Sequence, residues 1–363
     1  MSKMTSRELM LAAIEHKPID RIAFWPKLDA AYQSWYGKQL GTNNIEEIHK
    51  LLGTDQHYTT GGGYDIIHKN NTSQESNNTE TEHNIIYRIG NYILTEKHIW
   101  DGPSCSWHPV KHPINTPEDV KAMTEFIENM DINPNKESIK NCYDQINACP
   151  DALWAYGIGQ SSLMHFVEWM AGIETAHFLL ADVPDEVEDL FNAYHKYLLK
   201  ITKFAIENIN TDLYYYVENT STTLISPDQY NKYCFENITQ YGNILVSAGK
   251  RMALHMCGHL RKLLPKLSQL PAAVFEAFTS PPVGNTTLAE GRKQLPNQCL
   301  IGGTSAVTWL KKPDEIIEEI NGIITETKNL RGIILTSGGV MPPLCKPETI
   351  RTVAQWLQNI PVN

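Results

Sequence analysis

The sequence predicts an α/β fold in which eight parallel strands and their helices close into a single (β/α)8 TIM barrel. Short apolar, β-branched or aromatic runs recur along the 363 residues and are separated by segments of helical periodicity. No glycine-rich dinucleotide loop follows the first run, which disfavours an open doubly wound sheet. No repeat or linker divides the chain, so residues 1–363 are expected to form one domain. The eight expected strands are residues 21–25, 56–60, 152–157, 212–218, 251–257, 273–278, 299–303 and 332–337.

The expected helices have clear starting signals. Thr5 and Glu8 have the spacing of a capping box at the first helix. Proline in the first helical turn, followed by acidic residues, marks three further starts, which come after Thr116, Ser226 and Lys312. Strands alternating with such helices are typical of a parallel sheet.

One segment departs from this alternation and predicts an insertion after the second strand. Residues 70–78 are polar and rich in Asn, Ser and Thr, which indicates an exposed mobile loop. Residues 84–96 then predict a β-hairpin that turns at Gly90 and Asn91. We expect the insertion to cover part of the barrel mouth.

Composition narrows the classes of function. The formal net charge is −10, and phosphate binding needs clustered Lys and Arg, so we expect no nucleic-acid partner. No run of about 18 apolar residues occurs, so no membrane span is expected. The N-terminus lacks the features of a signal peptide, and an odd number of scattered cysteines, seven, indicates a reducing cytoplasm. No CxxC pair occurs, so a metal site would be assembled from distant segments. Oligomeric state has no signal in the sequence.

The most informative stretch is His255-Met-Cys-Gly, at the end of the expected fifth strand. Residues two apart in a strand point to one face, so His255 and Cys257 can converge on one point. Two such ligands suit a tetrahedral zinc ion, which would hold the thiol as thiolate. The alternative is a core strand in which Cys257 is a small hydrophobe and His255 a satisfied polar residue.

Other candidate site residues follow the C-terminal strand ends, where (β/α)8 barrels carry their chemistry. Glu276, on the next strand, could be a third zinc ligand, fix the tautomer of His255, or bond a neighbouring backbone amide. Cys345, after the eighth strand, could complete the ligand set or simply be buried. Glu218 and Tyr156 are the candidate catalytic residues, although Glu218 could instead face a helix N-terminus.

Aromatic residues also gather near the expected mouth. Most of them are needed for packing in a core of this size. A few would wall a flat or apolar ligand such as a methoxylated aromatic compound. The residues concerned are Trp25, Trp35, Tyr36, Tyr64, Trp154, Tyr156 and residues 214–216.

Three segments carry a resemblance to a known family. Residues 5–22 pair a helix with Pro-Ile-Asp-Arg, residues 275–290 begin Phe-Glu-Ala-Phe, and residues 336–350 contain Ser-Gly-Gly-Val-Met-Pro-Pro. They resemble the opening helix, the end of the sixth strand and the close of the barrel in the uroporphyrinogen decarboxylase superfamily. The likeness runs from about the fifth residue to the end of the chain.

Within that superfamily the chain resembles the cobalamin- or corrinoid-dependent methyltransferases. That branch carries His-x-Cys on the fifth strand, matched here by His255 and Cys257, and a third zinc ligand, cysteine, after the eighth strand. The later position corresponds to Gly339, so the resemblance leaves Cys345 or Glu276 to supply further ligands.

The resemblance implies a zinc-dependent methyltransferase that moves a methyl group between a small substrate or thiol and the cobalamin of a separate corrinoid protein. Donor, acceptor and direction stay open. An alternative is a metal-free decarboxylase-like lyase acting on a carboxylated ring. That branch has an arginine-rich loop after its first strand, whereas residues 24–33 contain no arginine, and Lys27, Arg21 and His68 are poor substitutes. A third hypothesis, kept open by Gly339, is an inactive member that binds a corrinoid partner.

Overall fold

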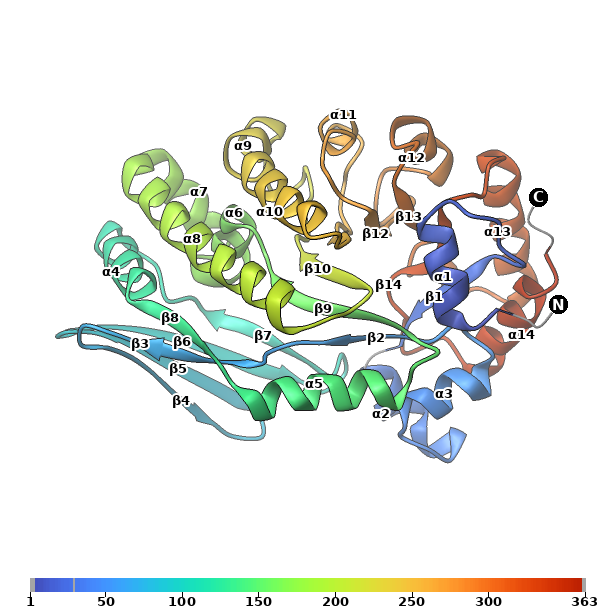
Figure 1. Cartoon of the computed structure of the whole chain (residues 1–363), viewed down its shortest axis with the longest axis horizontal. Helices are drawn as coiled ribbons and strands as arrows, with labels where there is room; N and C mark the ends of the chain where they lie inside the picture. The colour runs from blue at the N-terminus through green and yellow to red at the C-terminus, as the bar shows by residue number, and fades with distance from the viewer. Residues whose placement is uncertain (1–3, 29, 361–363) are drawn as a thin grey trace.

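The computed structural model describes residues 4–28 and 30–360 and confirms the barrel fold (Figure 1). Eight parallel strands form one sheet, and every expected strand is present. The strands are β1 (Ala23–Lys27), β2 (His57–Thr60), β9 (Leu153–Gly159), β10 (Leu213–Val217), β11 (Met252–His255), β12 (Val274–Phe278), β13 (Cys299–Gly303) and β14 (Ile333–Val340). Their order is β1-β14-β13-β12-β11-β10-β9-β2. No ladder joins β1 to β2 within the described residues, so a seam runs between these two strands.

Helices follow the strands and surround the barrel (Figure 1). The expected capping box at Thr5 is confirmed, and so are the helix starts after Thr116, Ser226 and Lys312. At Thr5, Thr116 and Ser226 the side-chain oxygen accepts the backbone N–H three residues later. No helix in the described part of the chain is long and apolar enough to cross a bilayer. The helical segments are α1 (Ser6–Ile14), α2 (Ala30–Leu40), α3 (Ile45–Leu52), α4 (Pro117–Glu128), α5 (Lys136–Ala148), α6 (Ser162–His165), the π-helix η1 (Phe166–Met170), α7 (Ile173–Asp182), α8 (Pro184–Asn208), α9 (Pro227–Tyr233), α10 (Phe235–Ser247), α11 (Leu264–Leu267), α12 (Leu288–Gln294), the 3-10 helix η2 (Thr308–Leu310), α13 (Pro313–Thr327) and α14 (Pro347–Leu357).

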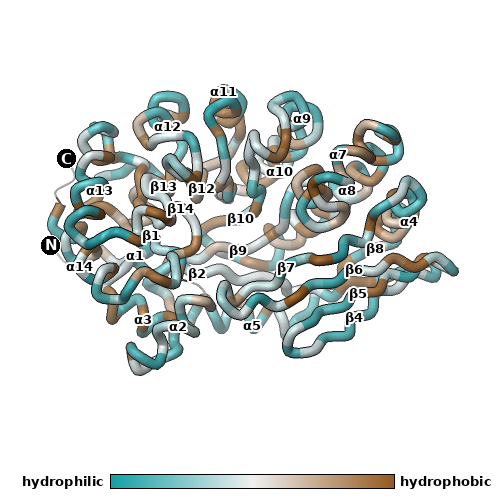
Figure 2. The backbone as a smooth tube through the Cα atoms, turned by 180° about the vertical axis from the view of Figure 1, so that it is seen from behind, coloured by the Kyte–Doolittle hydropathy of each residue, from teal (hydrophilic) through white to brown (hydrophobic). Residues whose placement is uncertain are grey.

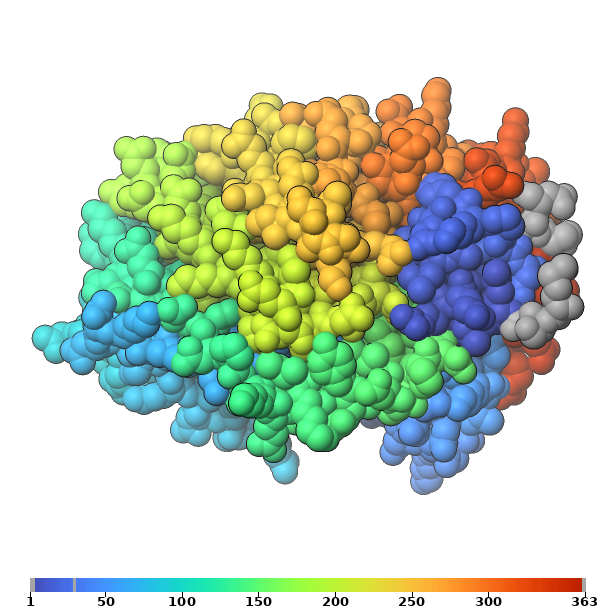
Figure 3. Space-filling model, in the orientation of Figure 1, coloured from blue at the N-terminus to red at the C-terminus, as the bar shows by residue number. Residues whose placement is uncertain are grey.

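Alternate residues of each strand serve two separate cores. On β1, Ala23 and Trp25 point into the barrel, whereas Phe24 points outward and stacks on Trp309 at 5.2 Å between ring centroids. The interior cluster includes residues of α1, which therefore packs against the strands from one end of the barrel (Figures 1 and 3). The outer cluster lies between the barrel wall and the helices. Successive side chains of a strand point to opposite faces, so every second residue reaches the barrel interior and the others face the surrounding helices.

The insertion after β2 is larger than the expected hairpin. The turn at Gly90 and Asn91 is confirmed, but the expected mobile loop at residues 70–78 is wrong, since most of it forms a strand that pairs with its neighbour along its whole length. The strand escaped prediction because its side chains are largely exposed and hydrophilic (Figure 2), and backbone pairing at a sheet edge needs no apolar pattern. The strands are β3 (Tyr64–His68), β4 (Thr72–Asn78), β5 (Glu82–Ile89), β6 (Tyr92–Asp101), β7 (Ser106–Lys111) and β8 (Met130–Pro134).

The seam between β1 and β2 is bridged at one point by the buried carboxylate of Asp55. This carboxylate accepts hydrogen bonds from both terminal nitrogens of Arg21, at 2.8 and 2.6 Å, and from the backbone N–H of Phe24 at 2.9 Å. The backbone N–H of Asp55 in turn donates to the Phe24 carbonyl at 3.3 Å. The pair Arg21–Asp55 therefore fixes the start of β2 against β1.

We expect Asp55→Ala to lower the free energy of unfolding by about 3–5 kcal/mol, because it leaves the buried Arg21 guanidinium without its carboxylate. Urea denaturation of both proteins measures this difference. Asp144→Ala removes an exposed i,i+4 partner of Lys140 and is the matched control, with an expected change below about 0.5 kcal/mol. A loss no larger than that of the control would contradict the role given to Asp55.

Candidate active site

Four strands each send one side chain to a common point near the C-terminal end of the barrel. His255 and Glu276 are register partners on β11 and β12, and His255 Nδ1 is hydrogen-bonded to Glu276 Oε2. The Tyr215 hydroxyl, from β10, donates to the same oxygen. Lys27, from β1, places Nζ 3.3 Å from Glu276 Oε2 and 3.2 Å from His255 Nδ1. We refer to these four residues as the His255–Glu276 cluster.

The cluster surrounds a buried negative charge. Glu276 is 1% exposed, and burial alone would raise its pKa, but Lys27, His255 and the Tyr215 hydroxyl outweigh burial and hold the pKa well below its ordinary value. Burial likewise acts to lower the pKa of His255, and the charge of Glu276 overcomes it, so the net direction is upward. Glu276 Oε1 is buried with no hydrogen-bond partner among the described residues. One acceptor at the centre of the site is thus left for a further cation or donor.

Cys257 lies just beyond β11 beside this cluster. Its half-buried thiol acts to raise the pKa of His255 and donates to Asn219 Oδ1 at 3.7 Å. The Asn219 amide donates in turn to Glu168 Oε2 at 3.0 Å, and burial raises the pKa of that carboxyl. Hydrogen bonds therefore connect Glu168, on η1, through Asn219 to the thiol of Cys257.

The backbone at the strand ends adopts positive φ angles next to two of these residues. Asn219, after β10, has φ of 47°, and Ala277, directly after Glu276, has φ of 59°. A positive φ is costly for alanine because of its Cβ, and such strain persists where surrounding contacts fix the backbone. The register of β12 with β13 shifts at the same place, between Glu276 and Phe278. The strain therefore coincides with the residues that hold the polar cluster.

Comparison with known proteins identifies the family. The model of the family described as uroporphyrinogen decarboxylase (URO-D) matches residues 109–360. The chain belongs to the uroporphyrinogen decarboxylase family. No curated protein matches it by sequence.

Two solved structures are similar to this URO-D family member at low sequence identity, and the first of them has the same kind of fold. A methyltransferase from Methanosarcina mazei has a TM-score of 0.59 and 12% identity, over 98% of each chain. A candidate vitamin-B12 independent methionine synthase from Listeria monocytogenes has a TM-score of 0.45 and 10% identity, over 94% of this chain and 96% of the other.

The two predicted catalytic residues lie outside the His255–Glu276 cluster. Glu218 is fully buried, and its carboxylate accepts the backbone N–H of Ser161 at 2.7 Å and the Ser161 hydroxyl, at the start of α6. It thus faces a helix N-terminus, the second of the two possibilities that the sequence left open. Tyr156 points into the outer core, where its hydroxyl donates to the Gly62 carbonyl.

Of the four predicted metal ligands, His255, Cys257 and Glu276 lie together, whereas Cys345 belongs to the outer core. Its thiol is 2% exposed, and burial raises its pKa to about 12. Among the described residues, no three His, Cys, Asp or Glu side chains are already arranged around one point as a metal requires. At Gly339, on β14, an added Cβ would have open space around it.

The sequence analysis undervalued Lys27, and it named Tyr215 only among the aromatic residues near the mouth and not as a partner of Glu276. The alternation of side chains along a strand would have pointed to both residues. On β1, Ala23 and Trp25 face the barrel interior and Lys27 is the next residue of that series, and Tyr215 is the inward-facing member of its tyrosine run. Arg21 and His68, the other two cations considered for binding a carboxylated ring, do not belong to the cluster. Arg21 is bound to Asp55, and His68 lies in the insertion.

The buried environment of Glu218 can be tested through the pH dependence of stability. Burial raises the pKa of its carboxyl from 4.5 to about 7, so the native state binds the proton more tightly than the unfolded chain. Its contribution to stability is therefore fully present below pH 4.5 and is lost as the pH rises through 7. Because Glu218→Gln cannot ionise, we expect its stability relative to the parent to increase by up to about 3 kcal/mol between pH 4 and 8, at about 1.4 kcal/mol per pH unit.

Urea denaturation across this pH range measures that difference. The control is Glu207→Gln on exposed α8 surface, for which we expect a change below about 0.5 kcal/mol at each pH. A difference for Glu218→Gln that does not vary with pH would exclude a titrating buried carboxyl.

Proposed function

We propose that this protein is a zinc-dependent methyltransferase that moves a methyl group between a small substrate or thiol and the cobalamin of a corrinoid partner protein. One observation carries the proposal: an imidazole and a carboxylate, from His255 and Glu276, are hydrogen-bonded across two adjacent strands, and the thiol of Cys257 follows two residues after His255. Membership of the uroporphyrinogen decarboxylase family supports it, and so does the fold shared with a methyltransferase.

The donor chemistry of His255, Cys257 and Glu276 fits zinc. Nitrogen, sulfur and oxygen donors in this combination are the ligands that zinc takes in catalytic sites, where a fourth position stays open for substrate. The unpartnered oxygen Oε1 of Glu276 offers a buried acceptor where a cation would be stabilised. Zinc held by these residues would supply a Lewis acid that lowers the pKa of a thiol or polarises a methyl donor.

The residues around the three donors have separate tasks. Tyr215 and His255 hold one carboxylate oxygen of Glu276, which orients the group. Asn219 Oδ1 accepts a hydrogen bond from the thiol of Cys257. Lys27 contributes the positive charge that a carboxylate buried this deeply needs. These contacts keep the three side chains in one region, and we expect a bound ion to draw their donor atoms around one point, since they are not so arranged among the described residues.

A metal-free lyase acting on a carboxylated ring is the second candidate, and Lys27 is the observation that favours it. A cation at the centre of the cluster could meet a substrate carboxylate. Lys27 is, however, already engaged by Glu276 and His255, and the cluster contains no arginine. In this cluster, a ring bearing many carboxylates would meet one cation, Lys27, which Glu276 and His255 already share. This candidate therefore ranks second.

Zinc content is the first measurement. We expect about one zinc per chain in the parent protein purified under reducing conditions, and loss of that zinc in Cys257→Ala, because the thiolate is a principal ligand. Cys345→Ala is the matched control and should keep the zinc, since its thiol lies in the outer core. Gly339→Cys adds a thiol in open space and should bind zinc more tightly than the parent. A parent without zinc after reconstitution would overturn the proposal.

Methyl transfer is the second measurement. We expect the zinc-loaded protein to accelerate transfer from methylcobalamin to 2-mercaptoethanol, or from 2-methoxyphenol to cob(I)alamin, followed by the cobalamin absorbance. Cys257→Ala should be slower by about 100-fold or more, since loss of even an outer-shell partner of a metal site costs about 10–100-fold. Release of CO2 from uroporphyrinogen without metal would favour the lyase, and zinc binding without methyl transfer in either direction would favour the inactive member.

A further inference from the structure

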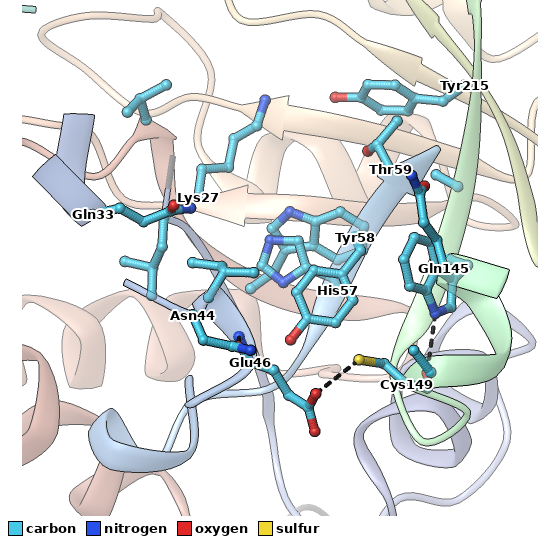
Figure 4. A pocket seen from close by; sticks show the side chains of 17 residues that line it. Lys27, Gln33, Asn44, Glu46, His57, Tyr58, Thr59, Gln145, Cys149 and Tyr215 are labelled. Atoms are coloured by element: carbon cyan, nitrogen blue, oxygen red, sulfur yellow. Dashed lines mark hydrogen bonds between the residues drawn. The ribbon is translucent and has the colours of Figure 1, made fainter. Parts of the chain in front are cut away.

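A cavity of about 600 Å³ lies at the seam between β1 and β2, beside the His255–Glu276 cluster (Figure 4). Its lining comes from both seam strands, from the start of α3 and from the end of α5. Lys27 and Tyr215 line it as well, and both contact Glu276. The cavity therefore extends from the side of the barrel to the centre of the site.

Aromatic rings form much of the wall of this seam cavity. Trp25 stacks on His57 with 4.0 Å between ring centroids, and Tyr58 packs against Trp154 at 5.1 Å. Burial lowers the pKa of His57 to about 3, so its ring is neutral at physiological pH. In the view of Figure 4, the rings of His57 and Tyr58 appear between Lys27 and Gln145. Such a wall suits a flat apolar ring.

Polar groups of the cavity differ between its two ends. At the outer end, Cys149 donates to Glu46 at 3.1 Å and its carbonyl accepts the Trp154 indole N–H at 3.0 Å, so these groups satisfy one another. At the inner end, the Lys27 side chain is 25% exposed. Two wall atoms, Trp25 Nε1 and the Tyr58 hydroxyl, are buried without a hydrogen-bond partner in the described chain. An oxygen-bearing ligand would supply the acceptor that the indole N–H lacks.

We propose that the seam cavity binds a monocyclic aromatic compound with oxygen substituents, such as a methoxyphenol, with its oxygen atoms toward Lys27. Its volume lies within the range of about 300–1,000 Å³ that is usual for small-ligand pockets. The role of this ligand as the methyl substrate rests on the proposed function. Its binding in the cavity does not depend on that function.

The position of the cavity has a consequence for access. A corrinoid is far larger than a methoxyphenol, and both must approach the same donors for methyl transfer. Entry of the small ligand through the seam leaves the C-terminal mouth of the barrel to the larger partner. The missing ladder between β1 and β2 provides that second opening.

Calorimetric titration of the full chain with 2-methoxyphenol tests the proposal. The saturated analogue 2-methoxycyclohexanol carries the same oxygens without the aromatic ring, and we expect it to bind at least about tenfold more weakly because the ring contacts are lost. Two variants fill the cavity from α5, Ala148→Trp and Gln145→Trp, and both should weaken 2-methoxyphenol at least about tenfold. Asn141→Trp, on the same helix outside the lining, should bind like the parent.

Circular dichroism and the urea midpoint establish that each variant is folded. Absence of heat with 2-methoxyphenol at millimolar concentration, or binding unaffected by both filling variants, would overturn the seam site. Zinc content and transfer from methylcobalamin to 2-mercaptoethanol are measured on the same preparations. Aromatic binding without zinc or methyl transfer would support the cavity and overturn only the proposed function, whereas methyl transfer without aromatic binding would overturn only the cavity.

Discussion

The constraint on which the site depends is one buried negative charge, the carboxylate of Glu276. A carboxylate that is 1% exposed costs several kcal/mol unless donors and a counter-charge surround it. Here the compensating groups come from three other strands, Lys27 from β1, Tyr215 from β10 and His255 from β11. The donors reach the carboxylate only when these strands stand in their places around the barrel, so closure of the fold and assembly of the site are one event.

The seam between β1 and β2 follows from the same arrangement. β1 is fixed by its ladder with β14, by the Arg21–Asp55 pair and by Lys27, which reaches across the barrel to Glu276. Direct pairing with β2 is therefore not required to hold β1. The space that a ladder would have closed is instead lined by side chains, with Trp25 and His57 stacked across the seam. A binding cavity results from the place where the sheet is left open.

Features that depend on local pattern were predictable, and features that depend on distant partners were not. The eight strands could be found because buried parallel strands are apolar runs. His255, Cys257 and Glu276 could be found because alternate residues of a strand share one face and the strands that carry them are consecutive in the barrel. The hydrogen-bond partner of Glu218 is Ser161, a residue 57 positions away in the sequence. The residues around Glu218 do not identify this partner. The strand β4 depends on backbone pairing, to which its polar side chains give no clue.

Charge balance also bears on what loss of a metal would do to this fold. In a structural zinc site, uncompensated ligands repel one another without the ion, and the domain unfolds. Here the Lys27 ammonium already contacts the buried oxygen of Glu276 and the His255 ring, so the carboxylate stays paired whether or not a metal is present. The second oxygen, Oε1, has no hydrogen-bond partner among the described residues and would gain one from the proposed ion. If the proposed zinc binds at this point, we expect the fold to persist without it, as for a catalytic rather than a structural metal site.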